Sequence, residues 1–251
     1  RTEGWIAGLQ MAALSMRDRK DTAGFIEGFS GTNRYILDYL LEEVLSSQPQ
    51  EIQHFLISTA FLERLAAPLC DAVLAEDQES QETGADRLDQ SAAMLAHLDR
   101  ANLFLVPLDD ERRWYRYHHL FADLLQAKLY QAGYTAVAQL QSRAARWCAQ
   151  NGHINEAVGY AFAARAYQQA AALIAGNWQQ KTNTGEIETV WSWLSALPED
   201  IVRSSASLSI IYAWLLWLTG QTGAIEGRLL DAERALGGQD TAQEPGGDSD
   251  F

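Results

Sequence analysis

Cysteine and basic residues are both scarce in this sequence. Among 251 residues there are two cysteines, Cys70 and Cys148, which lie far apart and form no CxxC pair. Neither a disulfide framework nor a zinc site is therefore predicted. Lysine and arginine total 19 against 33 aspartates and glutamates, which gives a net charge of −14. Because so acidic a surface repels the phosphate backbone, we expect no direct binding of nucleic acid.

The signatures of a membrane protein and of an enzyme are also missing. There is no signal peptide and no run of about 18 apolar residues, and the short apolar stretch 208–218 predicts a buried helix. We expect a cytoplasmic protein without membrane contact. The phosphate-binding pattern GxxxxGK(S/T) is absent, as are a Ser-His-Asp arrangement and metal-ligand spacing. The sequence therefore predicts no catalytic residue, no metal and no enzymatic activity for these residues.

What the sequence does contain is enough apolar material for a folded core. Hydrophobic residues make up 47% of the chain, and eight of its residues are tryptophan. The length suits two small domains, or one domain joined to a repeat array. The chain starts at Arg1 without methionine, and residues 4–17 follow at once with apolar groups at helical spacing. We therefore expect a piece excised from a longer protein.

The middle of the chain has the pattern of a winged helix. Several amphipathic helices precede two short segments of strand character that flank a charged turn. The segment 76–90 has almost nothing to bury and predicts a solvated acidic loop. The other predicted elements, in chain order, are helices at 35–46, after Pro49, after Pro68 and around Leu95–Leu98, strands at 104–107 and 114–117, and a helix from His118 through Leu129.

Helix hairpins are predicted from about residue 134 onward. Asn151-Gly152 is a typical helix stop, and a second stop is predicted at Gly220. The two glycines lie two periods of about 34 residues apart, the length of a tetratricopeptide repeat. The intervening unit, 187–197 followed by Pro198, has the right size but lacks a matching glycine. The fold class is therefore mainly all-α: a winged-helix module with a small β-wing, followed by tetratricopeptide-like repeats.

Three segments, taken in order, resemble the MalT-like branch of the LuxR-family transcription regulators. They are Thr2–Gln10, Asn33–Leu45 and Tyr115–Phe121. That branch belongs to the ATP-dependent STAND class of signal-transducing proteins, and the resemblance extends to about residue 236. It implies an internal fragment of a regulator that has an N-terminal nucleotide-binding domain and a C-terminal helix-turn-helix. ATP or ADP is then a cofactor of the longer protein, with none expected on these residues alone.

The resemblance also implies a division of the chain. Residues 1–30 correspond to the end of the nucleotide-binding and helical arm region, and 31–133 to the winged-helix domain. Residues 134–236 correspond to the first repeats of a superhelical sensor array, and 237–251 to a flexible tail. The implied partners are the nucleotide-binding domain and remaining repeats of the same protein, an unknown inducer or regulatory protein, and further copies of the protein in the active state.

His118 is the candidate nucleotide-binding residue. In related STAND proteins a winged-helix histidine touches the ADP phosphate and holds the closed state, and Tyr117-His118-His119-Leu120 resembles that Met-His-Asp motif with His119 in place of the Asp. His118 also stands where a strand meets a helix N-terminus, which attracts anions. The alternative interpretation is that His118 only caps its helix.

A dense set of tryptophans is the candidate ligand or partner surface of the repeats. Aromatic side chains on the concave side of a repeat array can stack on a small ligand or hold a peptide. At helical spacing, tryptophans also form hydrophobic cores, and both interpretations stay open. The candidates are Trp178, Trp191, Trp193, Trp214 and Trp217.

Three functions are consistent with this sequence. The leading hypothesis is a signal-relay segment that couples nucleotide state and inducer sensing to oligomerisation and transcription activation. The alternative is a stand-alone tetratricopeptide-like scaffold that binds other proteins. The third, a DNA-binding winged helix, lacks the expected basic surface, since charges between 86 and 130 are balanced.

Overall fold

The computed structural model describes residues 45–75, 90–101, 104–131 and 133–240, and these form helices with one small sheet. The chain divides into two compact units, Arg1–Ala144 and Ala145–Phe251. The predicted division at 133/134 falls at the start of helix α9, Tyr134–Gln150, while the two units meet inside that helix. The expected arm region at 1–30, the helix at 35–46 and the loop at 76–89 lie outside the described residues.

The described part of the first unit contains helices α4, α5, α7 and α8, the start of α9, and a wing. Helix α4 (Gln50–Ser58) follows Pro49, and helix α5 (Ala67–Leu74) carries Pro68 in its first turn, as predicted. Each buries an apolar face that includes Phe55 and Leu56 in α4, and Leu69 and Val73 in α5. Helix α7 (Gln90–Arg100) packs against α5, where the N–H of Ser91 donates to a carboxylate oxygen of Asp71.

The wing is an antiparallel pair of short strands. Strand β1 (Leu105–Pro107) pairs with β2 (Tyr115–Tyr117), so that Leu105 lies opposite Tyr117. Leu65 adds a third stretch of backbone through reciprocal hydrogen bonds with Tyr115 of 2.7 and 2.9 Å. Helix α8 (His119–Gln131) follows β2 and buries Phe121 and Leu125 completely. The prediction of a winged-helix module with a small β-wing is confirmed.

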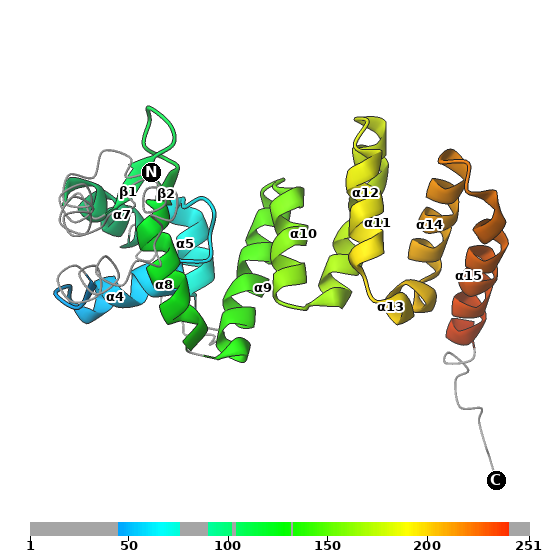
Figure 1. Cartoon of the computed structure of the whole chain (residues 1–251), viewed down its shortest axis with the longest axis horizontal. Helices are drawn as coiled ribbons and strands as arrows, with labels where there is room; N and C mark the ends of the chain where they lie inside the picture. Colours follow the sequence, from blue (N-terminus) through cyan, green and yellow to red (C-terminus); the bar gives the residue numbers. More distant parts are fainter. Residues whose placement is uncertain (1–44, 76–89, 102–103, 132, 241–251) are drawn as a thin grey trace, which may run out of the picture. The chain divides into compact units, whose positions relative to one another are not determined.

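Helical hairpins make up the second unit (Figure 1). Helix α10 (Ile154–Ala163) turns back from the end of α9, and α11 (Tyr167–Asn183) is followed by α12 (Ile187–Ala196). A short helix α13 (Glu199–Ser204) leads into α14 (Ala206–Leu218), and a 3₁₀ turn η2 (Thr222–Ala224) leads into α15 (Ile225–Asp240). Helix α10 packs on α11, α11 on α12, α12 on α14 and α14 on α15, so the predicted array of helical repeats is present.

A shared turn closes all three hairpins and corrects one prediction. The turn glycines Gly152, Gly185 and Gly220 have φ of 79°, 85° and 76°, so all three occupy the left-handed region. In each case the N–H of the next residue donates to a carbonyl five residues back, at 2.8 to 2.9 Å. The middle unit therefore does have its glycine, and the three turns follow one another at steps of about 34 residues.

Gly185 lies just before the apolar segment 187–197 from which the middle unit was predicted, so that segment itself contains no glycine. One further difference concerns the predicted tail. Helix α15 continues through Gly237 and Gly238 to Asp240 before the described part of the chain ends. Glycine lowers helix stability by about 1 kcal/mol without forbidding the helix, and α15 is already established when it reaches them.

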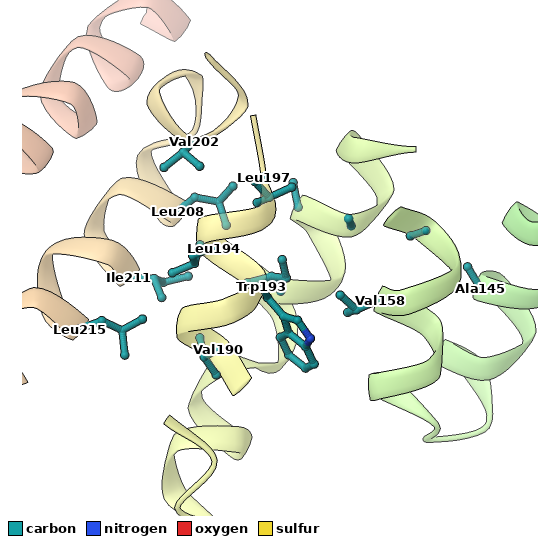
Figure 2. Packing of buried hydrophobic residues seen from close by; sticks show 14 residues of the cluster. Ala145, Val158, Val190, Trp193, Leu194, Leu197, Val202, Leu208, Ile211 and Leu215 are labelled. Atoms are coloured by element: carbon teal, nitrogen blue, oxygen red, sulfur yellow. The ribbon is translucent and has the colours of Figure 1, made fainter. Parts of the chain in front are cut away.

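One hydrophobic core runs through the second unit from the Ala145 end of α9 to α14 (Figure 2). Leu194 of α12 and Ile211 of α14 face each other inside it, and Trp193 belongs to the same cluster at 8% exposed. Helix α13 joins the core through Val202, whose carbonyl accepts a hydrogen bond of 3.0 Å from the buried hydroxyl of Ser209. The short extra helix is therefore a fixed part of the array.

Candidate functional site

His118 lies at the junction between the wing and helix α8. Its backbone N–H donates to the carbonyl of Phe104 at 2.7 Å, which extends the pairing of the wing strands by one residue. Its carbonyl accepts from the N–H groups of Phe121 and Ala122, each at 2.9 Å. The backbone of His118 is therefore the N-terminal cap of α8, and this part of the capping interpretation agrees with the structure.

The ring of His118 is enclosed by aromatic neighbours. It stacks on His119 with ring centroids 4.5 Å apart, and Phe104 meets it edge-on at 6.2 Å. Phe104 itself packs against Phe121 at 4.9 Å and has a φ of 56°. A left-handed backbone is costly for a bulky residue and is kept where packing compensates for it. His118 is 4% exposed, so in this conformation its ring does not face solvent.

A buried hydrogen bond fixes the wing to helix α4 just before this junction. The hydroxyl groups of Thr59 and Tyr117 lie 2.7 Å apart, and Thr59 also donates to the carbonyl of Phe55 at 2.7 Å. Thr59 is 0% and Tyr117 4% exposed, and burial raises the pKa of the Tyr117 phenol. The sequence pattern gives no signal for this contact, because Thr59 and Tyr117 lie 58 positions apart.

The candidate tryptophans separate into three environments. Trp193 is a core residue, as one of the two interpretations expected. Three others are partly buried and form aromatic pairs, Trp178 with Trp214 at 5.2 Å and Trp191 with Tyr212 at 5.4 Å. Trp217 is 64% exposed. The five side chains therefore do not form one common surface.

A charged network on helices α13 and α15 was not predicted. Arg228 donates to both carboxylate oxygens of Glu199, at 2.8 and 3.2 Å, and its guanidinium lies 4.2 Å from the ring centre of Tyr212. Asp231, at 8% side-chain exposure, contacts Arg234 at 3.0 Å. The hydrogen bond from Arg228 lowers the pKa of Glu199. The network ties α13 to α15 across Tyr212 of α14.

Among the described residues, no cluster of histidine, cysteine and carboxylate side chains could hold a metal ion. Cys70 and Cys148 are both buried there, and neither forms a disulfide. None of the described helices has the length and apolar character needed to cross a membrane.

Comparison with known proteins agrees with the two-part fold. Residues 41–137 match the family model of the MalT winged helix domain. The chain is also 33% identical over 239 residues to proteins named serine/threonine-protein kinase PknK, from two strains of Mycobacterium tuberculosis and from Mycobacterium bovis. These matches cover 94% of this chain and 20% of each relative. The chain thus spans about a fifth of the length of the curated relatives it matches.

The fold and its site define a winged-helix module followed by helical repeats. Residues 41–137 match the MalT winged helix domain, so the chain is MalT-like, as the resemblance of its three segments predicted.

Proposed function

We propose that this chain is the signal-relay segment of a larger MalT-like, ATP-dependent transcription regulator. The winged helix would hold the ADP-bound resting state, while tetratricopeptide-like repeats receive an inducer or a regulatory protein. The match of residues 41–137 to the MalT winged helix domain carries this proposal. The even spacing of the three turn glycines supports the tetratricopeptide-like part. The proposal assigns no catalysis to these residues.

The relay requires two conformations with different ligand affinities. A ligand changes the balance between two states only by the difference in its affinity for them. Moving a protein from 1:99 to 99:1 takes a preference of roughly 10⁴, or about 5.5 kcal/mol. In this proposal, ADP favours the closed state, and inducer with ATP favours an open state that oligomerises.

His118 is the proposed contact to the ADP phosphate in the longer protein. Its place at the start of α8 suits an anion, because the helix dipole and the first N–H groups of a helix attract negative charge. The described residues fit only one such contact, since they contain no phosphate-cradling loop. The ring is also buried in this conformation, so contact with a phosphate requires movement of the residues that cover it, Phe104 among them.

The proposed role of His118 can be tested in the longer protein. We expect His118→Ala to raise signal-independent transcription and to weaken ADP binding, because the closed state loses a phosphate contact. His54→Ala is the matched control, since His54 is exposed on α4. Unchanged basal transcription together with unchanged ADP affinity would show that His118 is no nucleotide sensor. His118→Gln, which keeps a polar side chain, separates loss of the contact from loss of packing.

A second candidate is a relay segment inside a protein kinase. The observation in its favour is that the mycobacterial relatives, which match 94% of this chain, are named serine/threonine-protein kinases. The flanking coding sequence decides between the two: a helix-turn-helix after this segment supports the regulator, and a kinase domain supports the second candidate. A start codon directly before Arg1 would instead favour the stand-alone scaffold.

A further inference from the structure

Phe104 contacts the ring of His118 from an unusual backbone conformation. Its φ is 56°, in the left-handed region, where a bulky residue is a genuine outlier. Strand β1 begins only at Leu105, yet the carbonyl of Phe104 already accepts the N–H of His118 at 2.7 Å. Phe104 therefore continues the pairing of the wing through its carbonyl, while its own backbone departs from the extended conformation of a strand.

Two aromatic contacts of the Phe104 ring compensate for this backbone. The ring centroid lies 4.9 Å from that of Phe121, at an interplanar angle of 33°, and 6.2 Å from that of His118, at 72°. Both separations lie in the range where aromatic pairs attract each other. A strained backbone persists only where the surrounding contacts outweigh its cost, and such strain is concentrated at functional sites. The conformation of Phe104 thus depends on its contacts with His118 and with helix α8.

The other aromatic neighbours at this junction are held more firmly than Phe104. Phe121 is 0% exposed on α8, and the hydroxyl of Tyr117 takes part in a buried hydrogen bond. His119, which stacks on His118, is the first residue of α8. Phe104 is half-buried and belongs to neither a helix nor a strand. It is therefore the neighbour of His118 that moves at the least cost, since relaxing its backbone to the extended region relieves strain.

We propose that Phe104 is the gate of His118: its ring keeps the imidazole buried, and a change of its backbone from the left-handed to the extended conformation uncovers the imidazole. The gate is closed in the conformation described here, in which His118 is 4% exposed. Loss of the two ring contacts opposes opening, whereas relief of the backbone strain favours it. Because Phe104 lies outside α8 and the paired strands, opening requires no movement of either. The inference rests on the proposed function only for the anion that the uncovered imidazole then contacts.

A gate of this kind lowers the apparent affinity of the His118 site for a phosphate group. A ligand that binds only the open form has its affinity reduced by the fraction of molecules that are open. Removal of the Phe104 ring therefore raises the affinity, whereas damage to the fold would lower it. This difference in sign separates a residue that positions His118 from one that only supports the packing of the wing.

Histidine labelling in the full-length protein, freed of nucleotide, tests the gate. Diethyl pyrocarbonate acylates exposed imidazole rings, and fragmentation of the labelled peptides separates His118 from His119. The exposed His54 is the internal reference. The test variant is Phe104→Ala. The matched controls are Phe104→Tyr, which keeps the ring, and Val106→Ala, which shortens another half-buried side chain of the wing.

In the unmodified protein we expect His118 to react at least about 10-fold more slowly than His54, since a minor open state is populated to about 10% at most. In Phe104→Ala, His118 is expected to react about as fast as His54, while Phe104→Tyr and Val106→Ala keep the slow rate. Equal rates at His118 and His54 in the unmodified protein would overturn the proposal. A slow rate in Phe104→Ala, or a fast rate in either control, would overturn it as well.

Hydrogen exchange of α8 shows whether each variant keeps the winged helix folded. If α8 loses protection in Phe104→Ala, then Phe104→Leu, which keeps apolar volume without the ring, takes its place with the same expected rate. Loss of protection in both variants would show that Phe104 supports the fold itself, and would overturn the proposal.

ADP titration separates the gate from the proposed function. We expect the affinity of Phe104→Ala for ADP to rise, at most by the factor by which the labelling rate of His118 rises, because both depend on the open fraction. Faster labelling of His118 with unchanged ADP affinity would support the gate and overturn only the phosphate contact. The labelling rates themselves depend on neither ADP nor transcription, so failure of the gate and failure of the proposed function are distinguishable.

Discussion

At the scale of single residues, buried polar contacts decide how the wing is held. The Thr59 hydroxyl has two partners, Tyr117 and the carbonyl of Phe55, and no solvent exposure. A buried polar group that loses its partner costs about 1 to 3 kcal/mol, more than the net gain from an average hydrogen bond. The winged-helix unit is therefore sensitive to this one pair.

Thr59→Val tests the pair with a side chain of nearly the same shape. We expect the free energy of unfolding to fall by about 1 to 3 kcal/mol, because the Tyr117 hydroxyl keeps its burial and loses its partner. Urea denaturation measures the change. The double variant Thr59→Val/Tyr117→Phe is the control, and it is expected to lose less than the sum of the two single variants. Strict additivity would mean that the two hydroxyl groups are not coupled.

Residue types alone did not settle the roles of the tryptophans. Helical spacing gives the face on which a side chain lies, but not which neighbouring helix covers that face. From the sequence, Trp193 and Trp217 could each be a core residue or a ligand-binding residue. The structure places Trp193 in the core and leaves Trp217 64% exposed. The difference arises from the packing of helices distant in sequence, since Trp193 shares its core with residues of α10, α11 and α14.

At the scale of elements, the turn glycines determine where each hairpin closes. Gly185 has a φ of 85°, and a Cβ added there meets no atom within 4 Å. The cost of a side chain at this position is therefore conformational and not steric. A left-handed backbone costs an L-residue roughly 1 to 2 kcal/mol.

Gly185→Ala is accordingly expected to lower the free energy of unfolding of the repeats by about 1 kcal/mol. Gly176→Ala is the matched control, because Gly176 lies inside the same helix α11, and a Cβ there also meets nothing within 4 Å. The control is expected to gain about 0.5 to 1 kcal/mol, since alanine is the better helix former. Urea denaturation measures the change in the free energy of unfolding for each variant. A change in the same direction in both variants would contradict this account of the turn.

The contact between α13 and α15 makes the stability of the repeats depend on pH in the acid range. The Arg228 hydrogen bond lowers the folded-state pKa of Glu199 below its usual 4.5. The contribution of this carboxylate is therefore present above about pH 4.5 and is lost as the pH falls through the folded-state pKa. Its size is modest, because the Glu199 side chain is 51% exposed and screened by solvent.

Glu199→Gln is expected to lower stability at pH 7 by less than about 1 kcal/mol and to reduce the loss of stability below pH 4.5. Thermal unfolding at pH 7 and at pH 3.5, at low and high salt, measures both effects. Asp200→Asn removes a charge from the same exposed helix turn and serves as the control. If both variants lose the same stability between pH 7 and pH 3.5, Glu199 is not the source of the pH dependence.

The sequence was informative about elements wherever local chemistry sets them. It predicted the wing strands at 104–107 and 114–117, and the structure has Leu105–Pro107 and Tyr115–Tyr117. Helix α8 was expected from His118 and begins at His119. Helix α13 and the network around Arg228 were not foreseen, because Glu199 and Arg228 come together only after three helices have packed.

At the scale of the whole molecule, the negative net charge opposes DNA binding, which is the function that the winged-helix fold most often suggests. The net charge is −14, and phosphate contacts from lysine and arginine supply most nonspecific affinity for DNA. In the wing itself, Arg112 pairs with Asp99 and Arg113 pairs with Glu111, which leaves little basic surface for a groove. The winged-helix fold therefore suggests DNA as a partner, whereas the charge of the chain opposes DNA binding. We expect the charge to decide, because contacts with phosphate set the nonspecific affinity for DNA.

We expect this chain to show no binding to duplex DNA at 0.15 M salt, even at a protein concentration of about 100 µM, which lies at the weak end of nonspecific affinity. Fluorescence anisotropy of a labelled duplex measures this. The double variant Asp110→Lys/Glu111→Lys changes the charge of the wing turn without altering strand pairing, since both residues lie between the strands. Binding by that variant alone would show that charge is the barrier. Salt-sensitive binding by the unmodified chain would mean that a local basic surface outweighs the net charge, and the winged helix would then be a DNA-reading domain after all.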